Sequence, residues 1–541
     1  MEKKKIFIGV AWPYVNGDLH IGHVAGYLLP ADILARYFRL KKCEVLMVSG
    51  SDCFGTPISF EADKLGIKPQ EIVKRYHRRN KKIFKDLGIS FDIYFKTYHP
   101  FHQKIVQNFI LAFYKKNLLF TQKHLQYFDP EKNKFLPDRY VEGICPHCHF
   151  KGARGDQCEN CGKLIEQNLI QPLNRLTKKP VILKETESLY INWPLLQKEI
   201  TEYVKEKSKK WRPWIKKETI SWLKSGLNAR AVSRDINWGV KFPKILVKKW
   251  PSLKNKRIYV WFDAVIGYFS ASCYWALKNK KDWREFWLKK KSLHYYFMGK
   301  DNLVFHTIFW PGELIVFDKK LHLPDFPLIN HYLNLEGQKF SKSRGIMIEI
   351  KDFIEKFGSD SLRFYMWKIM PQNKDTSFTW QDYYQTHNDI LVGKIGNFVH
   401  RILVLYHQQN ISLPSKKILK KSIDYLNKYS KLIEEGNFVK AYDIFFNFVV
   451  LVNKFIDEQK PWEVKNKNLK LFSQIGGDLI TLMLTILISL YPICPFGTQK
   501  YFATLKIKNI FWPENEKDME ALISQVKLNF KPKPVFLKLN F

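Results

Sequence analysis

Acidic residues are scarce in this chain of 541 residues, where 51 Asp and Glu stand against 89 Lys and Arg. The formal net charge of +38 favours a polyanionic partner, with nucleic acid ahead of an anionic membrane surface. A lysine-biased genome would give the same balance. Charge alone therefore leaves both explanations open.

Long hydrophobic runs are also missing. The longest clean apolar run lies near Leu479–Leu490, far short of the roughly 20 residues that span a bilayer. The opening residues MEKKKIFIGVAWPYV resemble a signal peptide only faintly, because no small-residue cleavage site follows them. We expect a buried helix at 479–490, no membrane partner and a cytoplasmic location.

Cysteine is rare, with eight residues in the chain, which excludes a disulfide framework and favours a reducing compartment. Four of them are clustered as Cys145-x-x-Cys148 and Cys158-x-x-Cys161, with nine residues between the pairs. Two thiolate pairs at this spacing can close a tetrahedral metal site with no open position, which predicts a structural ion. The alternative is that the cysteines form disulfides. His147 and His149 lie in the first knuckle, and either could replace a cysteine as a metal ligand.

Apolar residues are present in quantity. Hydrophobic residues make up 45% of the chain and aromatic residues 15%, enough for a large core and unlike a disordered protein. Lys5–Val10 and Glu44–Ser49 are predicted as buried strands, and Leu19–Leu29 as a helix with Asp18 as its N-cap. Pro30 predicts a kink or a fresh helix start. Strand, helix and strand predict a βαβ unit with a parallel sheet.

The pattern changes after about residue 120, where a segment rich in turns, cysteine and tryptophan suggests an insertion. Strand-like runs return at Arg257–Trp261 and Leu293–Met298, and helical periodicity dominates from about residue 388. No internal repeat is evident. The expected division is 1–120 and 241–330 for the two halves of an α/β domain, 121–240 for the insertion, 331–388 for a connecting region and 389–541 for a helical bundle.

Two histidines follow the first predicted strand. His20 and His23 are three residues apart on one helix face, and Gly22 leaves room for a ligand. A helix N-terminus behind a parallel strand, with two imidazole donors, suits a phosphate group that gains charge during transfer. The alternatives are ordinary helix histidines or metal ligands.

A short basic loop supplies a second signal. It reads Lys339-Phe340-Ser341-Lys342-Ser343, and its lysines can reach a triphosphate as mobile point charges. On its own it could equally be a solvated charged loop.

Together, the HIGH and KFSKS motifs resemble the two signatures of class I aminoacyl-tRNA synthetases. The chain is similar to the methionyl-tRNA synthetase family in particular, from about residue 5 to about 515. The shared motifs occur in order: AWPYVNGDLHIGH, SDCFGTP, CPHC…CENC, VWFDAVIGY, GKDNLVFHTIFWP, KFSKS, KIGNFVHR and KPWE.

The resemblance implies a Rossmann-like doubly wound parallel sheet with an inserted zinc-knuckle domain and a C-terminal α-helical bundle. It also implies one structural zinc ion on the four cysteines, and Mg²⁺ bound with ATP. His20, His23, Lys339 and Lys342 would be catalytic and, with Gly299, Asp301 and Ser341, would bind ATP. Arg234 and Asp235 resemble a family strand near the pocket, without a defined role.

A methionine slot is implied as well, because aromatic side chains suit a thioether. Asp52 would face the ammonium group, and the other contacts would be Trp12, Tyr14, Trp261, Ala264, Tyr268, Phe305 and His306. Trp12 and Phe54 depart from the residues of many relatives. Core packing is the alternative for Trp261 and Tyr268.

In the predicted bundle, Asn397 and Arg401 lie one helical turn apart, and Trp462 follows a proline. These positions match the family's anticodon readers, and stacking and edge hydrogen bonds read single-stranded loops. The alternative is a buried Asn–Arg pair with a core tryptophan.

The predicted function is that of a methionine–tRNA ligase. It would form methionyl-adenylate from L-methionine and ATP, and then charge tRNA(Met) with a CAU anticodon for initiation and elongation. A nucleotidyltransferase, a leucine, isoleucine or valine synthetase, and a non-enzymatic tRNA-binding protein are the alternatives. The chain ends without an appended tRNA-binding domain, so we expect a monomer.

Overall fold

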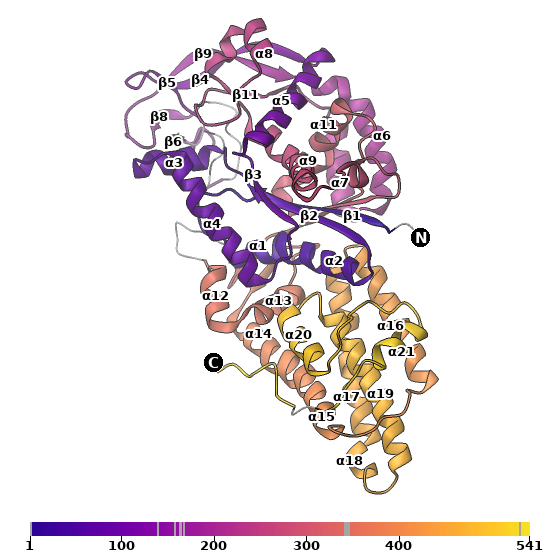
Figure 1. The fold of residues 1–541 in the computed structure, drawn as a ribbon. Coiled ribbons are helices and arrows are strands. Elements are labelled where there is room, and N and C mark those ends of the chain that lie inside the picture. Colours follow the sequence, from indigo (N-terminus) through magenta and orange to yellow (C-terminus); the bar gives the residue numbers. More distant parts are fainter. Residues whose placement is uncertain are drawn as a thin grey trace.

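A five-stranded parallel sheet forms the centre of the catalytic half (Figure 1). The computed structural model describes residues 3–137, 140–155, 158, 160–161, 165, 168–339, 347–529 and 532–540. The strand order β14-β13-β1-β2-β3 reverses between β1 and β13, which is the doubly wound arrangement. The strands are β1 (Lys5–Val10), β2 (Glu44–Ser51), β3 (Ile93–Lys96), β13 (Leu293–Gly299) and β14 (Phe326–Asn330).

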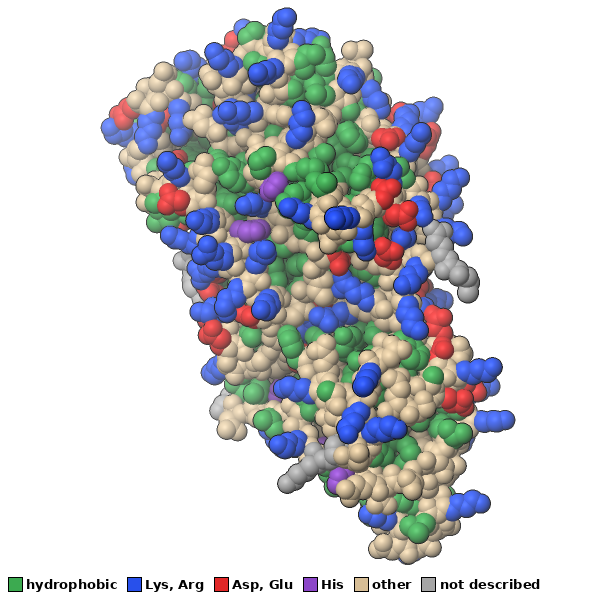
Figure 2. Space-filling view, in the orientation of Figure 1, with side chains coloured by type: hydrophobic (Ala, Val, Ile, Leu, Met, Phe, Trp, Pro, Cys, Tyr) green, Lys and Arg blue, Asp and Glu red, His purple; other side chains and the backbone are tan. Residues whose placement is uncertain are grey.

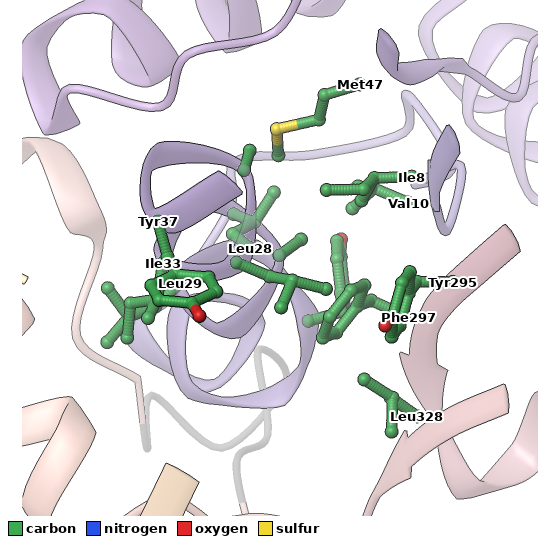
Figure 3. Packing of buried hydrophobic residues seen from close by; sticks show 14 of the residues in the cluster. Ile8, Val10, Leu28, Leu29, Ile33, Tyr37, Met47, Tyr295, Phe297 and Leu328 are labelled. Atoms are coloured by element: carbon green, nitrogen blue, oxygen red, sulfur yellow. The ribbon is translucent and has the colours of Figure 1, made fainter. Parts of the chain in front are cut away.

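Helices cover both faces of this sheet, because its strands are apolar on both sides. One face carries α1 (Ile21–His23), the π-helical segment η1 (Val24–Leu28) and α2 (Leu29–Leu40); the other carries α5 (Pro100–Lys115), α9 (Val260–Asn279) and α11 (Trp310–Phe317). In Figure 3, Ile8 of β1, Leu28 of η1 and Phe297 of β13 pack together, and all three are fully buried. Each such side chain stabilises the fold by about 1.5–3 kcal/mol relative to exposure.

The remaining elements of the catalytic half surround the carboxyl edge of the sheet. Two helices follow β2, namely α3 (Thr56–Leu65) and α4 (Pro69–Leu87). The short elements near β13 are α10 (Arg284–Trp287), η6 (Lys300–Asn302) and η7 (Phe305–Phe309).

The expected insertion, 121–240, belongs to a separate set of antiparallel sheets and helices in the upper part of Figure 1, which runs on past residue 240 to Ile258. Its strands are β4 (Leu119–Asp129), β5 (Lys134–Phe135), β6 (Val141–Ile144), β7 (Lys151–Arg154), β8 (Ile170–Asn174), β9 (Ile182–Ile191), β10 (Arg230–Ala231), β11 (Ser233–Arg234) and β12 (Arg257–Ile258). Its helices are η3 (Trp193–Leu196), α6 (Gln197–Lys207), η4 (Ser208–Lys210), α7 (Pro213–Lys224), α8 (Lys244–Lys249) and η5 (Pro251–Asn255).

The C-terminal part is a small sheet region followed by a helical bundle. The first comprises β15 (Leu333–Leu335), β16 (Gln338–Lys339), α12 (Ile350–Phe357), α13 (Ser359–Lys368) and β17 (Thr376–Phe378). The bundle comprises α14 (Trp380–Gln385), η9 (Thr386–Gly396), α15 (Asn397–Leu405), α16 (Lys416–Glu434), α17 (Phe438–Gln459), α18 (Pro461–Val464), α19 (Leu469–Leu490), α20 (Pro495–Thr504) and α21 (Glu516–Ile523).

Helix α19 contains the apolar run near residues 479–490. By length and composition it could cross a membrane, but 83% of its most apolar window is buried inside the protein. The expectation of a buried helix is confirmed, and the helix is the apolar centre of the bundle.

A buried arginine joins the catalytic half to the bundle. Arg363 of α13 donates from Nη2 to Asp32 Oδ2 at 2.6 Å and to the carbonyl oxygen of Pro492 at 2.8 Å, and from Nε to the carbonyl oxygen of Ile493 at 2.6 Å. Asp32 also accepts a hydrogen bond from Arg36 at 2.8 Å. Burial alone would raise the pKa of Asp32, but Arg36 and Arg363 hold it well below its usual range. The carboxylate is therefore ionised at the interface.

The first helix begins later than predicted, and Asp18 is not its N-cap. His20 is the cap, because its Nδ1 accepts a hydrogen bond from the N–H of Gly22 at 3.2 Å. The chain before Ile21 stays extended because Leu19 and Ile21 form backbone hydrogen bonds with residues 348–350. A fresh α-helix does begin at Leu29, with Pro30 in its first turn as predicted.

The run at Arg257–Trp261 is also only partly a strand. Strand β12 ends at Ile258, and Val260 begins helix α9. Periodicity cannot separate a short buried strand from a buried helix, and pairing with the two residues of β11 decides the length here.

Candidate active site

The two histidines of the HIGH motif lie together at the carboxyl end of β1. Their ring centroids are 4.0 Å apart, and Nδ1 of His23 lies 3.2 Å from the backbone N of His20 and 3.2 Å from its carbonyl oxygen. In the tautomer whose Nδ1 accepts from that N–H, Nε2–H of His23 is the donor. Burial lowers the pKa of His23 to about 4, so in the unliganded protein the ring is neutral. The pair offers directed N–H donors at a helix N-terminus.

The segment after the KFSKS motif pairs with the HIGH motif, although about 330 residues separate His20 from Glu349. His20 forms a β-bridge with Glu349, and the N–H of Ile21 donates to Ile348 at 3.1 Å. Ser341 and Lys342 lie outside the described residues. Lys339 ends β16, and its side chain is likewise outside them.

Gly299 and Asp301 lie across the sheet's reversal point from the histidines, at the end of β13. Space is open at Gly299, where an added Cβ would meet no atom within 4 Å. Asp301 accepts a hydrogen bond from the hydroxyl of Tyr332. This partner was not predicted, because a lone tyrosine in a loop gives no signal in the sequence.

An aromatic slot lies next to these groups. Trp261 stacks on Phe305 with ring centroids 4.5 Å apart, and Tyr14 meets Trp261 edge-on at 6.0 Å. Nδ1–H of His306 faces the carbonyl of Asn302 at 2.9 Å, so Nε2 accepts from the hydroxyl of Tyr268 at 2.8 Å. Burial lowers the pKa of His306 to about 4, which keeps this ring neutral. Such a slot suits an apolar, polarizable side chain.

Trp12 forms a wall of the same region and is wedged between two glycines. A Cβ at Gly267 would lie 2.7 Å from its Cζ2, and one at Gly50 would overlap the ring more closely. Its edge meets Tyr268 at 6.4 Å. Ala264, one turn before Tyr268 on α9, is also buried. Both glycines are required by this tryptophan.

Asp52 follows β2 and is 2% exposed. Its backbone pairs with residues 13–15, and its Oδ1 accepts from the N–H of Phe54 at 3.3 Å. Burial raises the pKa of Asp52 to about 8, against the lowering effect of that N–H. The site therefore holds a carboxyl group that an incoming cation would ionise.

Two further buried acids near this site were not predicted. Asp263 and Glu313 are at most 1% exposed, and burial raises the pKa of each well above its usual range. In the described part of the chain, neither oxygen of Asp263 has a hydrogen-bond partner; Nε2 of His102 lies 3.6 Å away. The sequence gives no sign of this burial, because each acid is a single residue within an apolar stretch, VWFDAVIGY or WPGELIVF.

A cavity of about 460 Å³ opens from the slot toward the insertion. Tyr14 and Trp261 form its inner wall, and Arg234 and Asp235 lie on the side of the insertion. Arg234 stacks its guanidinium 3.9 Å from the ring centre of Tyr259, and Asp235 pairs with a buried lysine. Phe54 also lines the cavity and is 2% exposed, so its position is apolar.

The four clustered cysteines meet in the insertion around β6 and β7. Sγ of Cys145 lies 3.9 Å from Cys161, Sγ of Cys148 lies 3.7 Å from Cys158, and all four sulfurs are within 4.8 Å of one another. These distances exclude disulfides, whose sulfurs are about 2.05 Å apart. A tetrahedral zinc ion with Zn–S bonds of about 2.3 Å places its sulfurs about 3.8 Å apart, so the cluster fits such an ion.

Asn397, Arg401 and Trp462 lie at the far end of the bundle from the sheet. The guanidinium of Arg401 lies 5.2 Å from the ring centre of Trp462, and its Nη2 is 3.2 Å from Asp457. Asn397 is exposed and Trp462 is 42% exposed. The three form an open surface, unlike the buried pair with a core tryptophan that was the alternative.

Comparison with known proteins places the chain in a class. The family model described as "tRNA synthetases class I (M)" matches residues 6–403. The fold is similar to that of Mycobacterium tuberculosis methionyl-tRNA synthetase solved with methionyl-adenylate, with a TM-score of 0.78, 19% identity and coverage of 98% of this chain and 99% of the other. The chain belongs to the class I aminoacyl-tRNA synthetases.

Its relatives define the member of that class. The chain is 44% identical to a methionine–tRNA ligase of Thermomicrobium roseum over 74% of its length and 68% of the relative's. It is 38% identical to one of Dehalococcoides mccartyi over 99% of its length and 97% of the relative's. Within the class, the chain belongs to the methionyl-tRNA synthetase family and is a methionine–tRNA ligase.

Proposed function

We propose that the described site joins methionine to tRNA in two steps. The carboxylate of methionine attacks the α-phosphorus of ATP, which releases pyrophosphate and leaves methionyl-adenylate. A terminal ribose hydroxyl of tRNA then attacks the acyl carbon, and AMP leaves. The observation that carries this proposal is the pairing of His20 with Glu349, because it joins the HIGH motif to the segment that follows the KFSKS motif in the sequence.

Catalysis in this scheme is alignment and charge stabilisation, with no side-chain nucleophile. Nε2–H groups of His20 and His23 would bind the phosphate oxygens, and Lys339 and Lys342 would add mobile positive charges. Ser341, Gly299 and Asp301 would complete the ATP site, the last two at the ribose. Mg²⁺ bound with ATP would neutralise the pyrophosphate oxygens.

Methionine would lie with its thioether in the aromatic slot and its ammonium group at Asp52. Trp12, Tyr14, Trp261 and Phe305 supply the aromatic surface. Ala264, Tyr268 and His306 would close the slot from the α9 and η7 sides. A slot walled by carbon and one neutral His–Tyr pair disfavours charged side chains.

The tRNA would extend from this site to the bundle. Asn397, Arg401 and Trp462 would read the CAU anticodon of tRNA(Met), in initiation and elongation. The regions of the chain would be 1–120 and 241–330 for catalysis, 121–240 for the zinc-bearing insertion, 331–388 for the KFSKS loop and stem contact, and 389–541 for anticodon binding. One zinc ion on the four cysteines, a monomeric state and a cytoplasmic location complete the proposal.

ATP–pyrophosphate exchange with each of the twenty amino acids tests the proposal. Methionine alone should support rapid exchange, and purified tRNA(Met) should then accept it. Exchange with leucine, isoleucine or valine would instead indicate another synthetase. Exchange without any amino acid would indicate a nucleotidyltransferase.

A further inference from the structure

Helix α4 carries a dense positive charge. Its 19 residues, PQEIVKRYHRRNKKIFKDL, contain seven Lys and Arg and two acids. Ile72, Ile83, Phe84 and Leu87 bury one face against the protein. The basic residues occupy the opposite face, and Figure 2 shows blue side chains gathered over this helix. The charge is thus concentrated on a solvent-facing strip.

Part of this strip is hollowed into a groove of about 540 Å³ between α4 and the end of β3. Four cations line it: Lys74, Arg78 and Lys81 from the helix, and Lys96 from the strand. Within the described ranges, none of the four forms an ion pair with a carboxylate, whereas Lys82, outside the groove, pairs with Asp86 at 2.9 Å. The groove therefore presents positive charge that no acid of the described chain neutralises.

The floor of the groove adjoins the amino-acid site. His77 Nδ1 lies 2.8 Å from the hydroxyl of Ser51, the residue before Asp52, and its ring stacks on Tyr94 at 5.2 Å. Burial, together with the charges of Lys96 and Lys81, lowers the pKa of His77 to about 4. Arg79 of the same helix pairs with Asp18 of the HIGH segment at 2.9 Å. The positive field thus lies at the mouth of the catalytic edge.

The spacing of the charges selects an extended anion. Lys74, Arg78 and Lys81 follow one another at i, i+4 and i+7, which spreads them over about 10 Å along the helix. One phosphate group cannot contact all of them at once. A sugar–phosphate backbone, with a charge at every nucleotide, can do so.

We propose that the groove between α4 and β3 binds the phosphate backbone of the acceptor arm of tRNA. This inference rests on the proposed charging of tRNA. The arm of the tRNA is assigned from position, because the groove is at the catalytic edge of the sheet. Helices α15 and α18, which carry Arg401 and Trp462, lie at the far end of the bundle from α4 (Figure 1). Contacts to phosphates position the RNA and read no sequence, so the groove should serve any tRNA that reaches it.

The triple variant Lys74→Gln, Arg78→Gln, Lys81→Gln tests the proposal. All three side chains are exposed, so the fold should be kept. Binding of an RNA minihelix that carries only the acceptor arm should weaken roughly ten- to a hundredfold at physiological salt, and the slope of log affinity against log salt should become shallower by about 2–3. ATP–pyrophosphate exchange should be unchanged, while kcat/KM for tRNA falls.

A matched control removes the same charge elsewhere. Lys198→Gln, Lys205→Gln and Lys209→Gln change three exposed lysines of α6 and η4, on the other side of the catalytic half (Figure 1). This control should bind the minihelix as the unaltered chain does. Equal losses of minihelix affinity in both variants would mean that only the net charge of the protein matters, and would contradict binding in the groove.

Three other outcomes also contradict it. Unchanged minihelix binding by the triple variant would show that the groove does not bind the acceptor arm, and would not affect the proposed ligase activity. Loss of exchange would assign the cations to ATP or pyrophosphate. Weaker binding of an isolated anticodon hairpin, with the minihelix unaffected, would move the contact to the other arm. Failure of the unaltered chain to charge any tRNA would instead reject the proposed function itself.

Discussion

Asp52 must be ionised to hold an ammonium group, yet its burial favours the neutral acid, with a pKa of about 8. Methionine should therefore displace a proton when it binds near neutral pH. Because the folded pKa of Asp52 exceeds its unfolded value of 3.8, the folded state holds the proton more tightly. The unliganded chain should therefore lose stability as the pH rises from about 4 to about 8. Burial thus couples binding to proton release.

Methionine affinity should rise about tenfold per pH unit up to about pH 8 and then level off. Calorimetry in two buffers of different ionisation enthalpy should detect close to one released proton at neutral pH. Asp52→Asn should weaken binding and remove the slope. A pH-independent affinity in the unaltered chain would place the ammonium group elsewhere.

His23 is the residue on which phosphate stabilisation depends in the proposed scheme. His23→Ala should slow adenylate formation by roughly 10²–10³, the scale of one preorganised donor. Methionine affinity without ATP should hardly change, because the histidine lies outside the aromatic slot. Exchange within a few-fold of normal would remove His23 from the ATP site.

Single residues also mark the limit of prediction from sequence. His20, His23, Asp52 and the four cysteines lie in motifs whose order was informative, so their clustering could be foreseen. The burial of Asp263 and Glu313 could not be predicted, because an acidic residue within an apolar stretch gives no information about the residues that pack against it in the fold. The first helix also begins later than predicted, because Leu19 and Ile21 form backbone hydrogen bonds with residues 348–350. The sequence near residue 20 contains no sign of these long-range bonds.

At the scale of elements, the β6–β7 knuckle is held by its cysteines. Its own apolar cluster is small and separate from the main core. Elemental analysis should find one zinc per chain, and Cys148→Ser should lower that content and the local stability, because metal binding and folding share free energy at such sites. Hydrogen exchange should speed up in residues 141–154 and stay unchanged in α19. Full zinc content in the variant would exclude Cys148 as a ligand.

The α15 and α18 surface makes a separate prediction. Trp462→Ala should leave ATP–pyrophosphate exchange intact and lower kcat/KM for tRNA by one to two decades, since a stacked base is worth about 1–3 kcal/mol. Discrimination against altered anticodons should weaken as well. Leu469→Ala, at an exposed apolar residue close by, is the control and should charge tRNA normally. Normal charging by the Trp462 variant at sub-saturating tRNA would leave the tryptophan without a role in the anticodon.

The whole molecule depends on Arg363, which is fully buried between the catalytic half and the bundle. Arg363→Leu should cost about 3–5 kcal/mol of unfolding free energy, because the buried Asp32 keeps only Arg36 as a cationic partner and the buried carbonyl oxygens of Pro492 and Ile493 lose their donor. Urea unfolding monitored by tryptophan fluorescence measures this. Arg284→Leu, at an exposed ion pair, should cost no more than about 1 kcal/mol. Equal losses in the two variants would show that the buried pair has no special weight.

The same arginine restricts how this chain could exchange parts with other proteins. A recombination event that replaced the bundle would also replace Pro492 and Ile493, whose carbonyl oxygens receive the donors of Arg363. A bundle taken from another protein would have to place two backbone carbonyl oxygens at the same positions, whatever its side chains. A crossover that keeps these contacts intact therefore lies before α2 or after Ile493.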